Sequence, residues 1–271
     1  MRPLRPLASR LASLLGKAGL ITAAASLAAC AQTSHGIASH DVRFDDVHFR
    51  VVTLDLHKAN LSLHWRNPAT GKPFASIHAL QAWGAAHHRA LLFAANAGIY
   101  DAKGEPLGLY VEGGKARKPL NTAHGNPAAG NFSLLPNGVF VIDATGHASV
   151  QTTTEFAAAQ LQPRTATQSG PMLVIDGKLN PHFDSASDSM KWRSGVCARN
   201  PDDVVFAVSA SPVNFHTFAA LFRDRLGCAN ALYLDGTLSQ IYVDGEYYGA
   251  PAFMVKPYAG IFAVFVPTRA R

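Results

Sequence analysis

The strongest constraint on the fold is a long series of short apolar runs, each bounded by Gly, Pro, Asn or Asp. Runs of this kind are typical of β-strands, whereas helices need longer periodic stretches. Only a few segments show helical signals. About a dozen strands irregularly interleaved with about three helices predict a single α+β domain with a mixed, largely antiparallel β-sheet core.

Two pairs of neighbouring runs suggest local hairpins. The first joins residues 47–56 to residues 61–65 through a short polar turn. The second covers residues 131–143, with Asn137 and Gly138 as its two-residue turn, because both positions tolerate a positive φ.

Three segments are predicted to be helical. Ser76 is a suitable N-cap for a helix that extends to about Arg89, and residues 153–161 form a second, short helix. A third helix starts after Asn214 and ends at Gly227. Its apolar residues recur at helical spacing and predict a stripe that packs into the core: Phe215, Phe218, Phe222 and Leu226.

The first 29 residues have the features of a targeting segment. They contain four basic residues and no acidic one, and they end in an apolar stretch at 18–29 that is short for a bilayer span. The sequence Leu27-Ala28-Ala29-Cys30 resembles the cleavage box of bacterial lipoproteins, in which the Cys carries the lipid. We therefore expect a signal peptide at 1–29, a lipidated tether at 30–43 and the folded domain at 44–271. An ordinary secretory signal with a chance Cys is the alternative.

The lipoprotein resemblance also implies a location. Ala31 follows Cys30, and no Asp stands there to retain the protein at the inner membrane. We expect an exported lipoprotein at the outer membrane, facing the periplasm and held by several acyl chains on Cys30.

The charge of the remaining chain argues against nucleic acid as a partner. Four of the 24 basic residues lie in the first 29, which leaves 20 against 18 acidic residues. A nearly balanced chain without a long basic run lacks the positive surface that nucleic-acid binding requires.

The two other cysteines, Cys197 and Cys228, suggest a disulfide, because exported proteins fold in an oxidising compartment. Closing a loop of this length stabilises a protein by about 3–4 kcal/mol in the chain-entropy model. Two separate buried thiols are the alternative.

Signatures of common enzyme classes are missing from the sequence. It has no Gly-x-Ser-x-Gly elbow, no phosphate-binding loop and no dinucleotide fingerprint, so we expect no cofactor. The 12 histidines are scattered, and no pair at helical spacing has a third ligand nearby, so no metal site is expected either.

The candidate site consists of strand ends that carry small and polar residues. The clearest is Asp235, the first charged residue after the apolar run 231–234, followed by Gly236 and, further on, Ser239. A carboxylate at the end of a buried strand is held rigidly at the rim of a pocket. The alternative is an ordinary turn capped by Asp235. Three other strand ends share this character, at residues 96–101, 168–171 and 191–195.

These four segments, in this order, resemble the phosphodiester glycosidase family over residues 44–266. Asn96-Ala97-Gly98-Ile99-Tyr100 is similar to its Asn-Gly-Gly-aromatic strand end, and Ser169-Gly170-Pro171 to its Ser-Gly-Pro segment. Arg193 stands where the family has an Arg before small residues, and Leu234-Asp235-Gly236 matches the start of its Leu-Asp-Gly-Gly-Gly-Ser. A bacterial subgroup shares three further motifs: Pro106-Leu107-Gly108-Leu109, Gly130-Asn131-Phe132 and Pro136-Asn137-Gly138-Val139-Phe140.

The resemblance implies a hydrolase of phosphodiester-linked sugars. Asp235 is then the acid/base or nucleophile, Arg193 grips phosphate, and Asn96 completes the catalytic set. Asp101 and Glu112 are reserve carboxylates. The residues that we expect to contact substrate are Gly98, Asp101, Ser169, Gly170, Gly236 and Ser239. A structural ion pair of Arg193 with Asp184 or Asp188, and a turn amide at Asn96, are the alternative roles.

The sequence departs from the family pattern at the Asp235 turn and near Asn96. Thr237, Leu238 and Ala97 stand where the family has glycines, which makes these turns stiffer. Two hypotheses therefore stay open. The protein is an envelope hydrolase of carbohydrate phosphodiesters, or it is a non-catalytic lipoprotein that binds an envelope glycan or a protein partner through the same cleft.

Overall fold

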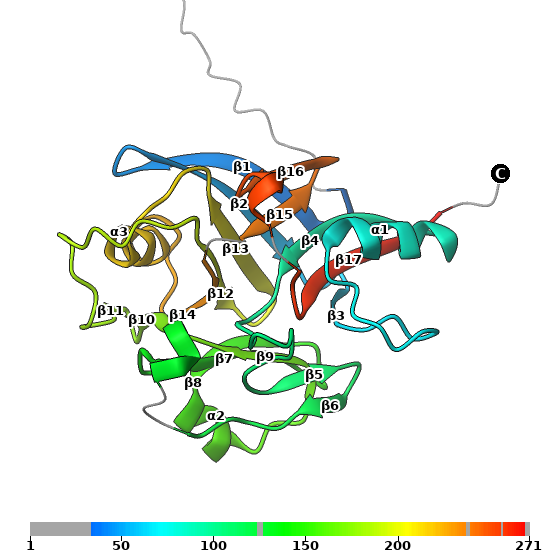
Figure 1. Ribbon diagram of the computed structural model, residues 1–271, viewed down its shortest axis with the longest axis horizontal. Helices are drawn as coiled ribbons and strands as arrows, with labels where there is room; N and C mark the ends of the chain where they lie inside the picture. The colour runs from blue at the N-terminus through cyan, green and yellow to red at the C-terminus, as the bar shows by residue number, and fades with distance from the viewer. Residues whose placement is uncertain (1–33, 124–126, 237–238, 256, 269–271) are drawn as a thin grey trace, which may run out of the picture. The chain divides into compact units, whose positions relative to one another are not determined.

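Three β-sheets turn apolar faces toward a common core in the computed structural model of this protein (Figure 1). The structure describes residues 34–123, 127–236, 239–255 and 257–268. The signal peptide at 1–29, Cys30, Ala31, Thr237 and Leu238 lie outside the described residues.

The largest sheet has seven strands and carries Asp235 at the end of one of them. In spatial order its strands are β1 (Ile37–Phe44), β2 (Val47–Asp55), β13 (Asp203–Ser209), β12 (Ser194–Asn200), β14 (Ala231–Asp235), β10 (Met172–Ile175) and β11 (Lys178–Leu179).

The two other sheets have five strands each. One has the order β16 (Glu246–Gly249), β15 (Gln240–Val243), β4 (Arg89–Asn96), β17 (Ile261–Pro267) and β3 (Leu61–His64). The other has the order β6 (Lys115–Lys118), β5 (Tyr110–Glu112), β9 (Pro163–Ser169), β7 (Gly138–Asp143) and β8 (Ala148–Thr152).

Aromatic side chains from all three sheets meet in the shared core. The Phe206 ring of β13 lies 5.0 Å from that of Phe93 in β4 and 5.1 Å from that of Phe262 in β17. Phe140 of β7 packs edge-on against Phe262 at 5.4 Å. All four side chains are fully buried, so this cluster fixes the three sheets relative to one another.

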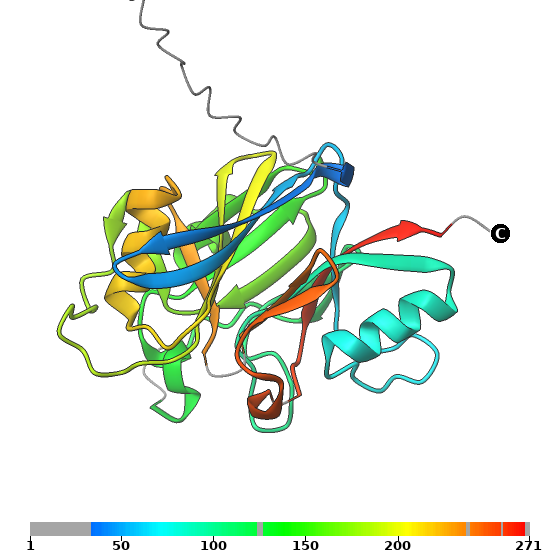
Figure 2. The same ribbon diagram turned by 90° about the horizontal axis from the view of Figure 1, so that it is seen from above.

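Each sheet is covered on its outer face by one helix, as expected for sheets whose two faces are both apolar. The helix α1 (Ile77–Ala86) packs on β4 and β17, and α2 (Thr153–Ala159) packs on β7 and β9. The helix α3 (Phe215–Ala220) continues into a π-helical turn, Leu221–Arg225, and covers the seven-stranded sheet. Figures 1 and 2 show α1 and α3 on opposite sides of the molecule.

The α+β class, the single domain and the three helices are confirmed. The predicted caps are also present: Ser76 and Asn214 accept hydrogen bonds from the N–H groups of Ala79 and Thr217. Every pairing between the strands named above is antiparallel, although the sequence suggested a mixed sheet.

Both predicted hairpins are wrong. The segments 47–56 and 61–65 belong to different sheets, because β2 pairs with β1 and β13 while β3 pairs with β17. Asn137-Gly138 is not a hairpin turn. Residues 127–133 form a 3-10 helix, β7 starts at Gly138, and β7 pairs with β8 instead.

The expected tether also needs correction. Residues 37–44 form the edge strand β1, which pairs along its whole length with β2. Its polar residues misled the prediction, because an edge strand with one solvated face alternates polar and apolar residues.

The predicted disulfide is present. Cys197 of β12 is bonded to Cys228, 31 residues later, and both residues are buried. It ties β12 to the segment that leads into β14, and therefore to the strand that ends at Asp235.

Candidate functional site

Asp235 is held by a tight turn at the end of β14. The Gly236 N–H donates to its Oδ1 at 2.6 Å, and the Ser239 hydroxyl lies 2.7 Å from both the Asp235 and Gly236 carbonyl oxygens. Ser239 is fully buried, whereas Asp235 is partly exposed. Ser239 thus shapes the turn, and Asp235 reaches the surface.

The surroundings of Asp235 favour its neutral form. Desolvation raises the pKa of the Asp235 carboxyl to about 6, although the Gly236 N–H opposes the shift. A carboxyl with this pKa exists in both protonation states near neutral pH, which suits a catalytic acid or base.

A cavity of about 270 Å³ opens beside this carboxyl. This volume lies near the lower end of the roughly 300–1,000 Å³ that small-molecule sites occupy. The cavity is lined by Asp235, by the segment 99–102, and by Leu107, Gly130 and Asn131. The sequence prediction missed Tyr100 and Asn131 as site residues, although both stand in motifs that it recognised.

Two tyrosines contribute hydroxyl groups close to Asp235. Burial, assisted by the negative charge of Asp235, raises the pKa of both Tyr100 and Tyr233 well above the usual range. Both phenols therefore stay neutral at physiological pH and keep an O–H group that can donate. Tyr233 contacts the cavity wall, because the Asn131 side-chain amide donates to its hydroxyl at 3.4 Å.

Arg193 lies behind the cavity instead of lining it. Its side chain is 1% exposed, with Nε donating to the Val213 carbonyl and Nη2 to the Ser189 carbonyl, each at 2.8 Å. The guanidinium lies 3.6 Å from the Phe215 ring centroid, and Nη1 lies 3.5 Å from the Tyr233 hydroxyl.

These contacts agree with neither role predicted for Arg193. Among the described residues, no carboxylate pairs with it, so the ion pairs with Asp184 or Asp188 are not formed. Burial lowers the pKa of Arg193, but an arginine remains charged in a protein. The positive charge reaches the cavity through Tyr233.

Asn96 lies beneath the site as a buried cross-link. Its Nδ2 donates to the Ser194 hydroxyl at 2.9 Å, and its Oδ1 accepts the Gln240 N–H at 3.1 Å. Ser194 stands opposite Asp235 in the pairing of β12 with β14. Asn96 therefore joins the three sheet segments that position Asp235, without lining the cavity.

Ser169 and the nearby glycines also serve as supports. The Ser169 hydroxyl donates to the Leu234 carbonyl and accepts the Ile99 N–H, so it fixes β14 to the cavity wall. A Cβ at Gly98 would lie 2.6 Å from the Gln168 carbonyl, and one at Gly170 would overlap the Asn137 side chain. None of these three lines the Asp235 cavity.

Of the reserve carboxylates, Asp101 lines the cavity and Glu112 does not. The Asp101 Oδ1 accepts the N–H groups of Lys103 and Glu105, which makes it the acceptor of a turn. Glu112, on β5, lies 3.6 Å from Arg117, and burial raises its pKa.

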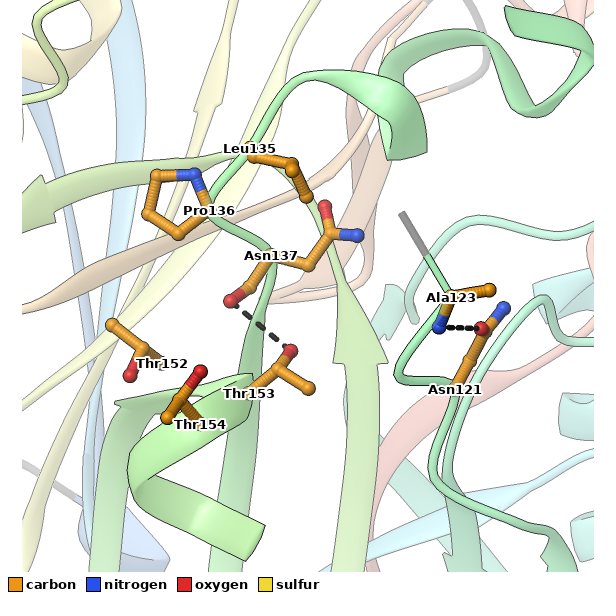
Figure 3. A pocket seen from close by; sticks show the side chains of 8 residues that line it. All are labelled: Asn121, Ala123, Leu135, Pro136, Asn137, Thr152, Thr153 and Thr154. Atoms are coloured by element: carbon orange, nitrogen blue, oxygen red, sulfur yellow. Dashed lines mark hydrogen bonds between the residues drawn. The ribbon is translucent and has the colours of Figure 1, made fainter. Parts of the chain in front are cut away.

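Figure 3 shows a second, smaller cavity next to α2, with a volume of about 90 Å³. Asn137 and Thr153 lie on one side of it, joined by a hydrogen bond from the Thr153 hydroxyl to the Asn137 carbonyl, and Asn121 lies on the other. This space is well below the range for small-molecule sites. It therefore does not compete with the Asp235 cavity as a substrate site.

Within the described part of the chain, no cluster of three or more His, Cys, Asp or Glu residues is arranged to hold a metal ion. In the same residues, no helix is both long and apolar enough to cross a membrane.

Comparison with known proteins agrees with this architecture. The chain is 33% identical over 212 residues to the uncharacterized protein YigE of Escherichia coli (strain K12), covering 78% of this chain and 80% of that protein. The catalytic domain of zebrafish N-acetylglucosamine-1-phosphodiester alpha-N-acetylglucosaminidase, auto-inhibited by its pro-peptide, superposes with a TM-score of 0.56 at 16% identity. That match covers 84% of this chain and 81% of the zebrafish chain.

A hypothetical protein from Synechocystis also has a TM-score of 0.56, at 15% identity, over 87% of this chain and 63% of the other. At such identities these two structures support the fold alone. The sequence model of the family described as phosphodiester glycosidase matches residues 90–265. This span includes every strand end at the Asp235 cavity, and the chain therefore belongs to the phosphodiester glycosidase family.

Proposed function

We propose that this protein hydrolyses phosphodiester-linked sugars in the cavity beside Asp235. The observation that carries the proposal is the carboxyl of Asp235, with its pKa of about 6, at a cavity that also presents Tyr100 and Asn131. Family membership supports the substrate class. The zebrafish enzyme is named for an N-acetylglucosamine-1-phosphodiester, which makes such compounds the first to assay.

The chemistry needs an ionised carboxylate more than it needs an acid. A phosphate ester is a good leaving group, so its departure requires little protonation. As a base, Asp235 takes a proton from water while the water oxygen attacks the anomeric carbon. The C–O bond then breaks, and its electron pair leaves with the phosphate monoester. As a nucleophile, Asp235 instead bonds to the anomeric carbon while the C–O bond to the phosphate breaks and the phosphate monoester leaves. Water then cleaves the glycosyl ester, which releases the sugar and restores the Asp235 carboxyl.

Arg193 supports the anionic part of the substrate through Tyr233. The buried guanidinium has no carboxylate partner among the described residues, and it lies within 3.5 Å of the Tyr233 hydroxyl. The Tyr233 hydroxyl also accepts the side-chain amide of Asn131, which lines the cavity, so the positive charge acts on phosphate from behind that wall. Arg193 is thus a positioning residue in this proposal, and the direct grip on phosphate passes to hydroxyl and amide donors of the cavity.

A hydrolysis screen tests the proposal. The purified protein is incubated with N-acetylglucosamine-1-phosphodiesters and related hexose phosphodiesters, and the released sugar is measured. Asp235→Asn should lower kcat by about 10³-fold or more. Asp176→Asn is the matched control, because Asp176 is a turn carboxylate away from the cavity and should leave turnover unchanged. Glycan binding without turnover of any substrate would instead favour the non-catalytic lipoprotein.

We also propose that the protein is an exported lipoprotein anchored at the outer membrane through Cys30. The support is the sequence of residues 1–31, with its basic start, apolar stretch and Leu-Ala-Ala-Cys box. Labelling cells with a fatty-acid analogue should mark the wild-type protein and leave Cys30→Ser unmarked. Equal labelling of both would refute the anchor.

A further inference from the structure

A larger cavity, of about 600 Å³, lies on the α1 side of the Asp235 turn and has no part in the chemistry above. Its walls come from the first turn of α1, from the β15–β16 hairpin and from residues 249–255, which include the 3-10 helix Ala252–Met254 (Figures 1 and 2). Its volume is well within the range of small-molecule sites.

This cavity shares a wall with the Asp235 turn. Gln240 lines it and directly follows Ser239, whose hydroxyl is bonded to the Asp235 and Gly236 carbonyl oxygens. Ala250, which lines the cavity next to Gln240, donates its N–H to the Ser239 carbonyl at 2.8 Å. A molecule bound here is therefore one residue away from the turn that presents Asp235.

Gln240 offers an oriented donor to this space. Its Oε1 accepts the Tyr258 hydroxyl at 2.6 Å, and its Nε2 donates to the Ala250 carbonyl at 3.1 Å. These two bonds distinguish the Nε2 end of the Gln240 amide from its Oε1 end. A side-chain amide nitrogen carries two N–H groups, so the second N–H of Gln240 remains for a ligand. Gln240 itself is 7% exposed.

Tyr247 provides an open aromatic face at the same cavity. Its side chain is 45% exposed, and its ring is held by Tyr242 at a centroid distance of 5.1 Å. The apolar side chains of Ile77, Pro251 and Val255 line the cavity as well. An aromatic face beside oriented polar groups suits a ligand with one apolar face and a polar rim.

The described part of the lining carries no fixed charge. Among the described residues around this cavity, His78 is the single titratable group besides Tyr247, and there is no Lys, Arg, Asp or Glu. An ionised ligand would lose hydration here without gaining a counter-charge, whereas a neutral ligand loses little.

We propose that this cavity is a subsite for an uncharged pyranose ring, with its C–H face on Tyr247 and a hydroxyl group at the Gln240 amide. The inference does not depend on the proposed function, because the described residues that line this cavity and those that line the Asp235 cavity are two separate sets.

Binding of neutral sugars that cannot be hydrolysed tests the subsite separately from catalysis. Methyl glycosides of hexoses and of N-acetylhexosamines are titrated into the purified protein, with saturation-transfer NMR as the readout. At least one glycoside should bind both the wild type and Asp235→Asn. Tyr247→Ala should weaken that binding at least tenfold, while Tyr247→Phe, which keeps the ring, should retain most of it.

Phe253→Ala is the matched control, since Phe253 is 88% exposed in the 3-10 helix Ala252–Met254 and does not line the cavity. It should bind like the wild type. The subsite is refuted if no methyl glycoside binds, if Tyr247→Ala binds as tightly as the wild type, or if Phe253→Ala loses as much as Tyr247→Ala. Preferential binding of a neutral acyclic alcohol such as 1-hexanol would also refute it. Absence of phosphodiester hydrolysis, with the binding pattern intact, would refute the proposed function alone.

Discussion

The Nη1 of Arg193 lies 3.5 Å from the Tyr233 hydroxyl, which also accepts the side-chain amide of Asn131 at the cavity wall. Tyr233 is fully buried, and the charges of Arg193 and Asp235 shift its pKa in opposite directions. The pair thus connects a positive charge in the core with an acid at the surface.

Removal of the Tyr233 hydroxyl should reduce turnover without unfolding the protein. We expect Tyr233→Phe to lower kcat/KM by about tenfold, because Arg193 and the cavity residue Asn131 both lose the hydroxyl that they bond. The ring stays in place, so the protein should still fold, with a free energy of unfolding lower by about 1–3 kcal/mol for the unpaired Arg193 N–H. Tyr242→Phe is the control, because it removes a buried hydroxyl that bonds to Gln81 outside the cavity. Equal losses in both variants would argue against a special role for Tyr233.

The raised pKa of Asp235 makes a prediction about stability. The folded protein binds a proton at Asp235 more tightly than the unfolded chain does, so this group stabilises below pH 4 and costs stability as pH rises through about 6. The cost above pH 6 is at most about 3 kcal/mol, and solvent access to the partly exposed side chain lowers it. Asp235→Asn should therefore raise the free energy of unfolding at pH 7.5 and leave it nearly unchanged at pH 4.

Urea denaturation at the two pH values measures this difference. A variant that is equally destabilised at both would show that Asp235 has a structural role instead. A gain in stability together with a loss of turnover is the pattern expected for a residue kept for its chemistry.

The same pKa sets the acidic limb of the rate profile. Both proposed routes use ionised Asp235, so kcat/KM should rise with pH and level off above an apparent pKa of about 6. A profile that falls above pH 6 would assign Asp235 the role of general acid. Hydrolysis in ¹⁸O-labelled water identifies the bond that breaks. Incorporation of ¹⁸O into the released sugar means that the C–O bond is cleaved.

Asn96 should behave as a structural residue in mutagenesis. Asn96→Ala leaves the Gln240 N–H and the Ser194 hydroxyl without their buried partner, and we expect a loss of about 1–3 kcal/mol in the free energy of unfolding. The exposed Asn60, bonded to Arg164, is the matched control, and Asn60→Ala should cost about 0.5 kcal/mol or less. If Asn96→Ala instead lost most of its activity with unchanged stability, Asn96 would have a catalytic role.

Local sequence patterns were sufficient to predict the three helices and to select Asp235 as the central acid of the candidate site. Ser76 and Asn214 were recognised because a cap is a contact over three residues, and Asp235 because it ends an apolar run. Strand partners distant in the sequence were not recognised, since the alternation in β2 is the same whether it pairs with β3 or with β13. Tyr233 looked like a core residue for a similar reason: its neighbour Arg193 is 40 positions away in the sequence.

The position of β17 bears on how the chain completes its fold during synthesis. This strand, Ile261–Pro267, is the last one described, yet it lies in the interior of its sheet, between β4 and β3. A polypeptide that is synthesised from its N-terminal end presents β3 and β4 long before the strand that joins them. Until then, an edge of β4 that ends at Asn96 stays open, and the protein depends on its final segment to close it.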